Sequence, residues 1–587
     1  MKTQPTKANA GKGTLWLRSA GTLRSLVIAL IVLLAAAGNA SAQVTGGTWA
    51  QLTHEPCSKG QPCFTPDQAL LLTDGTVMVQ NYYGNDWYRL SPDQYGNYAN
   101  GTWNQIASLP AGYAPFAYGS AVLPNGKVII EGGEKGIFGP NCQGPRGLAT
   151  NCGAIYDPVK NMWTAEPPPD FGDMCGSNGT TWCVIAGAPT VVLPDGTFMM
   201  GDAGYLGDNY NLPPAKLQAF LPPPYTGTWM QADPNGTKHD GNGEEGWTLL
   251  PSVGSFFGPL SLVMTVDTYS RVQLVCNGYN SSELYIKELF YDSWSCLGNT
   301  PNMLYPNVNE MGPAILRPDG TVFQAGADQY TAILSPITTL PPLPNLWTAG
   351  PNFPLDSNGS QLEIEDGPAA LLPNGNVLMM ASEDETTPPA TFLELTPAPQ
   401  NQLVVVSGPP YANNLSSNEG QMLLLPTGEV LLIPHFGVSS YLEIYTPTNP
   451  NYDPSWAPVI CGGSCSYNQP VVIYNNYRNQ ISGLRFNGMS QGAAFGDEYQ
   501  SATNYPLIRI TDYSGFQPMV YYCRTHDHTS MGVQTGNLKV STFFDCPDVP
   551  TGTVGDLEVV ANGIPSNPML VVVVQVDPCE VQGPPYC

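Results

Sequence analysis

The hydrophobic positions of this chain recur as pairs of short apolar runs joined by a tight turn. Each pair has an apolar run, a turn of the type Pro-Asp-Gly or Pro-Asn-Gly, and a second apolar run. Six segments follow this outline: LLLTDGTVMVQ, AVLPNGKVIIEGG, VVLPDGTFMMGD, ILRPDGTVFQAG, ALLPNGNVLMMAS and LLLPTGEVLLIPH. Short apolar runs on either side of a glycine turn predict β-hairpins.

The spacing of the turn glycines gives the number of units. These glycines are Gly75, Gly126, Gly196, Gly320, Gly375 and Gly428, separated by 51, 70, 124, 55 and 53 residues. The step of 124 residues is too long for one unit and fits two. Within it, SLVMTVDTYSRVQLVCNG at 261–278 has the same outline without the glycine turn. We therefore expect seven units.

Two further short strands follow each hairpin. The third strand reads AIYDP, AFLPP, AILSP, LELTP or EIYTP, and the fourth carries a tryptophan in most units: Trp103, Trp163, Trp229, Trp294 and Trp347. Four antiparallel strands in each of seven units predict a seven-bladed β-propeller. The last unit lacks a fourth strand, and GGTWAQL at 46–52 is expected to supply it, which would close the ring and remove its exposed edges.

Beyond about residue 448 the regular spacing stops and a different alternating pattern begins. Seven short strands are expected in VVIYNN, SGLRFNG, PLIRITD, MVYYCRT, NLKVSTFF, DLEVVANG and MLVVVVQV. This size and strand count are typical of an immunoglobulin-like sandwich. The predicted fold is all-β, with a propeller at 43–448, an Ig-like domain at 449–577 and a disulfide-closed tail at 578–587.

The N-terminus has the features of a secretory signal at 1–42. Five basic residues precede the apolar run at 26–37, which is followed by Ala40-Ser41-Ala42. The run is short for a bilayer span and the small residues suit cleavage. The alternative is an uncleaved anchor. Cleavage would change the net charge from −26 to −31, because it removes five basic residues and no acidic ones. Such a surface repels nucleic acid and anionic membranes.

All 14 cysteines lie after the signal, as neighbours that could close seven local loops. The expected pairs are Cys57–Cys63, Cys142–Cys152, Cys175–Cys183, Cys276–Cys296, Cys461–Cys465, Cys523–Cys546 and Cys579–Cys587. Disulfides indicate an oxidising compartment, which fits a secreted or cell-surface protein. No CxxC pair has zinc-finger spacing, so a structural zinc site is not expected.

The blades, above all AVLPNGKVIIEGG followed by AIYDPVKNMW, resemble kelch repeats. A kelch-like propeller followed by an Ig-like early-set domain resembles the galactose oxidase and glyoxal oxidase architecture. That family holds copper with two histidines and two tyrosines, one tyrosine being cross-linked to a cysteine as a radical cofactor.

The family's copper motif is matched only in part. Thr525-His526 approximates its C-terminal histidine element, although Met531 comes one residue late. Its adjacent Tyr-His pair has no match, because that dipeptide occurs nowhere in the chain. The corresponding places hold Glu310-Met311, Glu365-Asp366 and Asn418-Glu419. Carboxylate and amide donors make a poor copper site, so copper is not expected.

Three histidines are candidate metal ligands: His526, His528 and His435. His526 and His528 would share one face of a strand and could touch the same ion. Arg524 on that face opposes a metal. The alternative is a strand end in which Asp527, Thr529 and Ser530 bond to local backbone groups.

Acidic residues recur just before the central strand pair of several blades. They are Asp67, Glu310, Glu365, Asp366 and Glu419. If these strands line the propeller axis, the carboxylates gather at one mouth, where they could bind calcium. The alternative is that they accept hydrogen bonds from loop amides. The polar loop at 233–245 is also acidic but lacks EF-hand spacing.

Taken together, the sequence favours a secreted binding or surface-structural protein that recognises glycan or protein through its propeller loops. The alternative is a copper oxidase of the galactose or glyoxal oxidase type with an altered metal site.

Overall fold

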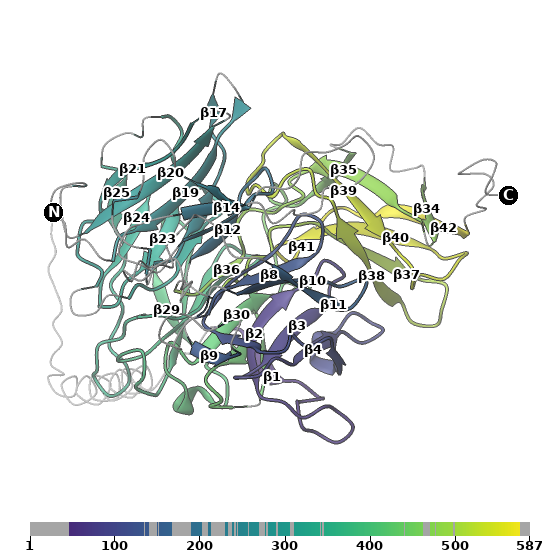
Figure 1. Ribbon diagram of the computed structural model, residues 1–587, viewed down its shortest axis with the longest axis horizontal. Coiled ribbons are helices and arrows are strands. Elements are labelled where there is room, and N and C mark those ends of the chain that lie inside the picture. Colours follow the sequence, from purple (N-terminus) through teal and green to yellow (C-terminus); the bar gives the residue numbers. More distant parts are fainter. Residues whose placement is uncertain are drawn as a thin grey trace, which may run out of the picture. The chain divides into compact units, whose positions relative to one another are not determined.

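The repeated hairpins fold into antiparallel sheets around a common axis (Figure 1). The computed structural model describes residues 46–575 apart from several segments, the longest being 143–149, 167–188, 202–208, 213–228, 269–275 and 462–469. The predicted signal peptide and the tail at 578–587 lie outside the described residues. Among the described residues, no helix has the length and apolar character needed to span a bilayer.

Turn chemistry explains why the motif forms hairpins. In five of the six turns the Asp or Asn side chain accepts a hydrogen bond from the backbone N–H two residues later, as Asp74 does from Thr76 at 3.0 Å. The following glycine has a positive φ, such as 76° at Gly75. Side chains other than glycine rarely adopt that conformation, so the Asp/Asn-Gly pair specifies the turn.

Six sheets have four strands, each in a simple antiparallel order. In the first three sheets the strands are β2 (Pro66–Leu71), β3 (Val77–Asn81), β4 (Trp87–Ser91) and β5 (Thr102–Ile106); β7 (Gly119–Val122), β8 (Val128–Glu131), β10 (Gly153–Asp157) and β11 (Met162–Glu166); and β12 (Thr190–Val192), β13 (Phe198–Gly201), β14 (Asn209–Leu212) and β15 (Met230–Gln231).

The next two are β16 (Thr248–Leu250), β19 (Ser261–Val266), β20 (Ser281–Glu288) and β21 (Tyr291–Asn299), then β22 (Ala314–Leu316), β23 (Val322–Ala325), β24 (Thr331–Leu334) and β25 (Trp347–Ala349). The fourth sheet differs from the prediction, because β16 is its first strand and the run at 261 is its second. The sequence TLL is too short to be recognised as a strand without a turn motif beside it.

The last four-stranded sheet closes the ring. It contains β30 (Gly420–Leu424), β31 (Val430–Pro434), β32 (Glu443–Thr446) and β1 (Thr48–Gln51). Strand β1 pairs antiparallel with β32, from Thr48 opposite Thr446 to Gln51 opposite Glu443. The N-terminal strand thus completes the unit that lacked a fourth strand, as the sequence predicts.

The remaining unit forms a five-stranded sheet. It contains β26 (Ala369–Leu371), β27 (Val377–Ala381), β28 (Thr391–Leu395) and β29 (Leu403–Val406), and β36 (Ala493–Ala494) pairs with the inner edge of β26. The prediction of seven four-stranded blades is therefore wrong in its count: six four-stranded blades form, together with this larger sheet. The fifth strand comes from the C-terminal part of the chain, which the repeat pattern does not describe.

Short elements decorate the blades. They are β6 (Tyr113–Phe116) paired with β9 (Lys135–Phe138), β17 (Gly254–Ser255) paired with β18 (Gly258–Pro259), and the 3-10 helices η1 (Tyr98–Asn100) and η4 (Ala412–Asn414). The innermost strands of the sheets are fully buried. Most neighbouring inner strands contact each other along the axis, as β2 does β7 and β22 does β26, and the last of them, β30, contacts the first, β2.

The C-terminal strands form a separate sheet system, shown in yellow-green in Figure 1. It comprises β33 (Val459–Ile460), β34 (Val471–Asn475), β35 (Asn479–Leu484), β37 (Leu507–Asp512), β38 (Met519–His526), β39 (Lys539–Asp545), β40 (Val554–Ala561), β41 (Ile564–Pro565) and β42 (Met569–Gln575). An apolar core that includes Ile508, Val540 and Val571 lies between them.

One connection of this sheet system runs along the propeller axis. We call residues 488–505, which contain β36, the axial segment. The carbonyl of Gly492 accepts a bond from Leu371, Gln491 bonds Leu249, and Ser501 bonds Gln421. The Tyr505 hydroxyl donates to the carbonyl of Leu71. The axial segment therefore contacts the inner strands of four sheets and fills the space between them.

Four predicted disulfides are present: Cys57–Cys63, Cys142–Cys152, Cys276–Cys296 and Cys523–Cys546. The predicted pairs Cys175–Cys183, Cys461–Cys465 and Cys579–Cys587 include residues outside the described part of the chain.

Candidate functional site at the propeller mouth

The end of the propeller axis at which the inner strands begin, here called the propeller mouth, collects several predicted residues. Asp67 lies at the start of β2, and His435 directly follows β31. The Nδ1 atom of His435 lies 2.9 Å from Oδ1 of Asp67, and both side chains are buried. The first strand of a sheet starts, and its second strand ends, at the same end of the blade. Asp67 and His435 meet here because the first and last sheets, although far apart in the sequence, are neighbours in the closed ring.

The axial segment contributes Tyr499 to this pair. The Tyr499 ring stacks on the His435 ring, with centroids 4.3 Å apart and an angle of 25°. Burial, and next the charge of Asp67, raises the pKa of the Tyr499 hydroxyl well above its usual range. Nε2 of His435 and the hydroxyl of Tyr499 are both buried without a hydrogen-bond partner. Buried polar atoms are normally satisfied, so these two atoms are available to a bound group.

Aromatic side chains cover the Asp67–His435 pair. Phe116 contacts Phe436, with ring centroids 5.2 Å apart, and stacks on Tyr83 at 5.5 Å and 6°. Tyr82 packs edge-on against Tyr83 at 4.6 Å. The Tyr83 side chain remains 39% exposed, so the cluster presents a flat ring to solvent.

Four residues with a left-handed backbone conformation lie at the same place. Tyr83, Ala117, Asp366 and Phe436 have φ values of 53°, 48°, 40° and 54°. Bulky residues seldom adopt this left-handed region, and such strain is often found at binding sites. A second aromatic stack stands in neighbouring loops, where Tyr411 and Tyr441 lie 4.8 Å apart at 23°.

An acidic cluster forms beside the five-stranded sheet. Carboxylate oxygens of Glu310, Glu365 and Glu385 all lie within 4.8 Å of one another. Glu310 precedes β22, Glu365 precedes β26 and Glu385 follows β27. Burial and then the charges of Glu385 and Asp384 raise the pKa of Glu365 to about 7.

Two further acids near this cluster, Glu363 and Asp328, also have raised pKa values. Burial, followed by the charge of Glu365, raises the pKa of Glu363 to about 8. Burial raises the pKa of Asp328 to about 6. Clustered carboxylates with raised pKa values hold protons near neutral pH and exchange them for cations as the pH rises.

The five acids predicted from the sequence do not form one cluster. Glu310 and Glu365 come together with Glu385, which the sequence reasoning missed. Glu419 accepts a hydrogen bond from the backbone N–H of Ser416 at 2.9 Å, as the loop-amide alternative expects. Asp67 bonds His435, and Asp366 lies against Gly496 of the axial segment. The acidic segment ASEDE at the end of β27 could have predicted Glu385. The second strand of a sheet ends at the same end of the blade at which the first strand begins.

The three predicted histidines do not form one site. Thr525 bonds the carbonyl of Thr73 and His528 bonds that of Pro124, which places His526 and His528 at the turn end of the inner strands. Asp67, which bonds His435, lies at the other end of β2. At the usual rise per residue of a β-strand, Asp67 and Thr73 are about 20 Å apart. None of the three belongs to a group of three ligand-type side chains among the described residues.

The expected shared face of His526 and His528 is also wrong. Strand β38 ends at His526, and Asp527 has a φ of 53°, so His528 leaves the strand. His526 contacts Asp527 and Asp545, whose carboxylates outweigh burial and raise its pKa. His528 bonds Thr542 at 2.9 Å, and burial lowers its pKa to about 3.

The strand-end alternative accounts for the surrounding polar residues. The Thr529 hydroxyl accepts a bond from the Ser541 N–H, and the Ser530 hydroxyl from the Gly532 N–H. Arg524 pairs with Asp545. In the loop at 233–245, Glu245 forms an ion pair with Lys238 at 2.9 Å. This carboxylate is therefore not available as a calcium ligand.

The donors at the mouth do not fit the copper site that the family resemblance implies. Such a site needs two imidazoles and two phenolates. His435 is the only histidine here: His54 contacts Gly101, His239 contacts Glu283, and the other two lie at the turn end. Beside the phenol of Tyr499, the donor in contact with His435 is the carboxylate of Asp67, and carboxylates favour hard cations over copper.

Neither a family model nor a curated protein matches the sequence. Among solved structures, the chain is similar to a fungal alcohol oxidase of the AA5 family in complex with copper, at 12% identity over 90% of this chain and 99% of that chain, with a TM-score of 0.45. An ulvan lyase (10% identity, 65% and 94% covered, TM-score 0.34) and an exotype rhamnogalacturonan lyase (10%, 69% and 74%, 0.34) are also similar. At these values the similarities carry no information on activity.

Proposed function

We propose that this protein is a secreted glycan-binding protein that holds sugar residues on the tyrosines of the propeller mouth. In this proposal residues 1–42 are a cleaved signal peptide, residues 43–448 a kelch-like propeller, and residues 449–577 an Ig-like early-set domain. The observation that carries it is the pair of stacked aromatic platforms, Tyr83 on Phe116 and Tyr441 on Tyr411, in loops around one end of the axis.

Ring stacking supplies the binding chemistry. The face of a tyrosine ring covers the apolar C–H face of a sugar, and its hydroxyl can also hydrogen-bond a sugar hydroxyl. Tyr83 and Tyr441 are 39% and 42% exposed, and each is held in place by the ring beneath it. Rigid aromatic side chains lose little conformational entropy on binding.

The acids at the mouth restrict the glycan class. In their ionised forms, Glu310, Glu365 and Glu385 repel sulfated or uronic-acid chains and attract a protonated amino group. We therefore propose neutral or amino-sugar oligosaccharides as ligands.

The test is an array of neutral, amino-sugar and acidic oligosaccharides, followed by calorimetry with the hits. Tyr83→Ala and Tyr441→Ala are expected to weaken binding about tenfold each, the effect of losing about 1.4 kcal/mol. Tyr95→Ala is the matched control, because Tyr95 is 46% exposed but follows β4, at the opposite end of its blade.

An array without neutral or amino-sugar hits, or equal losses for Tyr83→Ala and Tyr95→Ala, would refute the proposal. Binding of an extracellular protein through the same tyrosines would identify a protein ligand instead. A copper-loaded sample assayed for peroxide with alcohols and aldehydes tests the oxidase alternative, and stoichiometric copper with peroxide production would establish it.

A further inference from the structure

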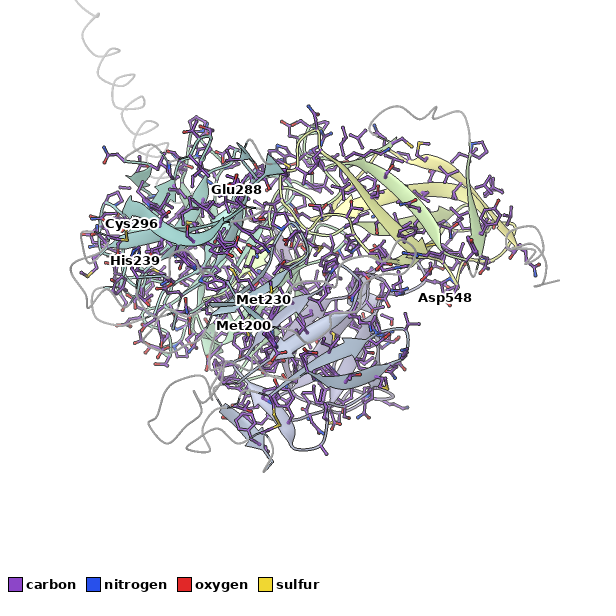
Figure 2. The ribbon with its side chains drawn as sticks, turned by 45° about the horizontal axis from the view of Figure 1, so that its top comes forward. Met200, Met230, His239, Glu288, Cys296 and Asp548 are labelled. Atoms are coloured by element: carbon purple, nitrogen blue, oxygen red, sulfur yellow. A yellow bond between two sulfur atoms is a disulfide. The ribbon has the colours of Figure 1, made fainter. Side chains whose placement is uncertain are left out.

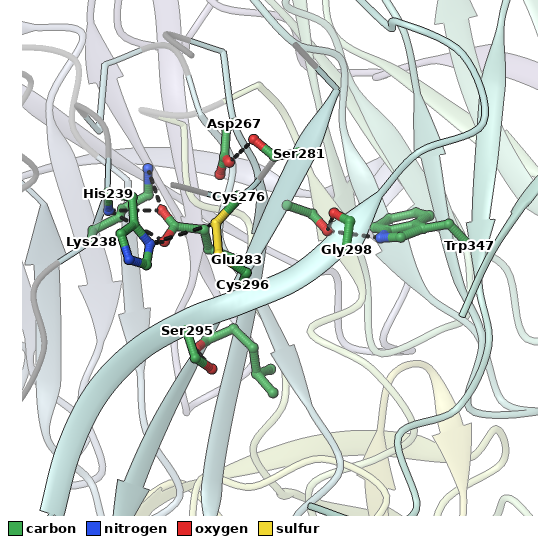
Figure 3. Close-up of a disulfide and its surroundings, with 12 residues drawn as sticks. Lys238, His239, Asp267, Cys276, Ser281, Glu283, Ser295, Cys296, Gly298 and Trp347 are labelled. Carbon is green, nitrogen blue, oxygen red and sulfur yellow. Dashed lines mark hydrogen bonds and ion pairs between the residues drawn. A yellow bond between two sulfur atoms is a disulfide. The ribbon is translucent and has the colours of Figure 1, made fainter. Parts of the chain in front are cut away.

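A second chemically reactive cluster lies in and beside the fourth sheet, where Figure 2 shows His239 and Cys296 close together. One ligand-type atom from each of His239, Cys276 and Cys296 lies within 4.8 Å of the others. The two cysteines form a disulfide, and Figure 3 shows His239 and Glu283 beside it.

The pairing of β20 with β21 explains why Glu283 lies beside the disulfide. Glu283 in β20 lies directly opposite Cys296 in β21, and opposed residues of antiparallel strands project to the same side. Cys276 comes from the connection between β19 and β20. Nδ1 of His239 bonds the Glu283 carboxylate and lies 3.6 Å from Sγ of Cys276.

The charges around the group are balanced by a buried lysine. Nζ of Lys238 lies 2.9 Å from Glu245 and 3.6 Å from Glu283, and these three side chains are fully buried. Glu245 also accepts a bond from Thr265. Lys238 is thus held mainly by Glu245, and Glu283 faces His239 and the bridge.

We propose that reduction of the Cys276–Cys296 bridge creates a binding site for a zinc-like divalent cation, with Cys276, Cys296 and His239 as ligands and Glu283 as the fourth. In a tetrahedral zinc site with bonds of about 2.05 Å to nitrogen and about 2.3 Å to sulfur, the nitrogen and sulfur lie about 3.6 Å apart. The distance between His239 Nδ1 and Cys276 Sγ already has this value.

Reduction of the bridge and binding of the cation are two separate steps. A tertiary phosphine reduces the disulfide by two electrons, taking the oxygen of one water to become the phosphine oxide, and the two hydrogens of that water end on the two sulfurs. The cation then displaces both thiol protons to solvent and replaces the hydrogen shared by His239 and Glu283. Two thiolates and one imidazole favour zinc over calcium or magnesium.

The ligands come from separate segments, which explains why cysteine spacing alone gave no zinc motif. Cys296 is exposed, so reductant and metal can both reach the bridge. Cys523–Cys546, by contrast, is fully buried and remains protected under mild reduction.

The test compares zinc uptake by the full-length secreted protein before and after phosphine treatment, using competition with a chromogenic chelator. We expect one additional zinc per chain after reduction. Cobalt in place of zinc should give the intense visible bands of a tetrahedral site and thiolate charge-transfer absorption. His239→Ala keeps both cysteines and should weaken zinc binding tenfold or more. His54→Ala is the control, because its ring contacts Gly101 elsewhere.

Circular dichroism in the near ultraviolet reports whether the reduced protein stays folded. No additional zinc after reduction, or equal uptake by reduced wild-type and His239→Ala proteins, would overturn the proposal. So would loss of the folded signal that zinc does not restore.

Discussion

Closure of the propeller by β1 can be tested with Trp49→Ala. Trp49 packs against Phe392 and Tyr445, with ring centroids 5.0 Å away in both cases. Its Nε1–H donates to the carbonyl of Ser407 at 2.7 Å. Through these contacts the side chain joins the closing strand to the neighbouring five-stranded sheet.

The contacts give an estimate of the loss. Removing a fully buried tryptophan costs about 3–5 kcal/mol, and Trp49 is partly exposed, so about 2 kcal/mol is expected from packing. The hydrogen bond adds about 1 kcal/mol, and the aromatic pairs contribute about 0.5 kcal/mol more. We therefore expect the free energy of unfolding to fall by about 3 to 4 kcal/mol.

Urea unfolding measures this loss, and hydrogen exchange shows where it acts. The amides of β32, which pair with β1, should exchange faster in Trp49→Ala, whereas those of β38 should not change. Trp347→Ala is the matched control. It removes a buried tryptophan that bonds Ser282 at 2.8 Å, but from a blade whose strands are continuous in sequence.

Two results would refute the reasoning. A stability loss below about 1 kcal/mol would mean that Trp49 does not anchor β1. Unchanged exchange in β32 would mean that the ring stays closed without it.

Two further predictions concern the mouth and the axial segment. In the folded state the pKa values of Glu363 and Glu365 are raised from 4.5 to about 8 and about 7. Above pH 4.5 the folded state therefore binds more protons than the unfolded state. Thermal stability should fall as the pH rises from 4.5 to 8. Glu363→Gln should flatten this slope, and an unchanged slope would contradict the assignment. Gln421→Ala removes bonds to Ala69 and Ser501 and should cost about 2 kcal/mol in urea unfolding, against no more than about 0.5 kcal/mol for the exposed Gln51→Ala.

The sequence predicts structure well where the chemistry is local. Asp74 and Gly75 specify their turn with their own side chain and backbone, so the hairpins could be placed correctly. Strand β16 could not, because TLL becomes an inner strand only by pairing with β19. The addition of β36 depends on contacts between residues more than 120 positions apart, and no periodicity describes such a contact.

At the candidate site, too, the features set by the repeat could be predicted, and those set by distant contacts could not. Glu310 and Glu365 could be placed at one mouth because they precede equivalent strands of neighbouring units. The three histidines could not, because the left-handed conformation of Asp527 ends β38 between two of them. Which end of the axis each histidine occupies is decided by contacts such as that of His528 with Pro124.

Ring closure also orders the folding of this chain in time. The backbone of Gly47 bonds Tyr445, 398 positions later, so during synthesis the first strand remains unpaired until almost the whole propeller has been made. The axial segment arrives later still, and the inner strands that it bonds must wait for it. Pairings this distant in sequence form slowly, and a nascent chain with an open sheet edge is prone to aggregate. Folding of this protein should therefore finish only after release of its C-terminal strands, with no stable propeller intermediate before that point.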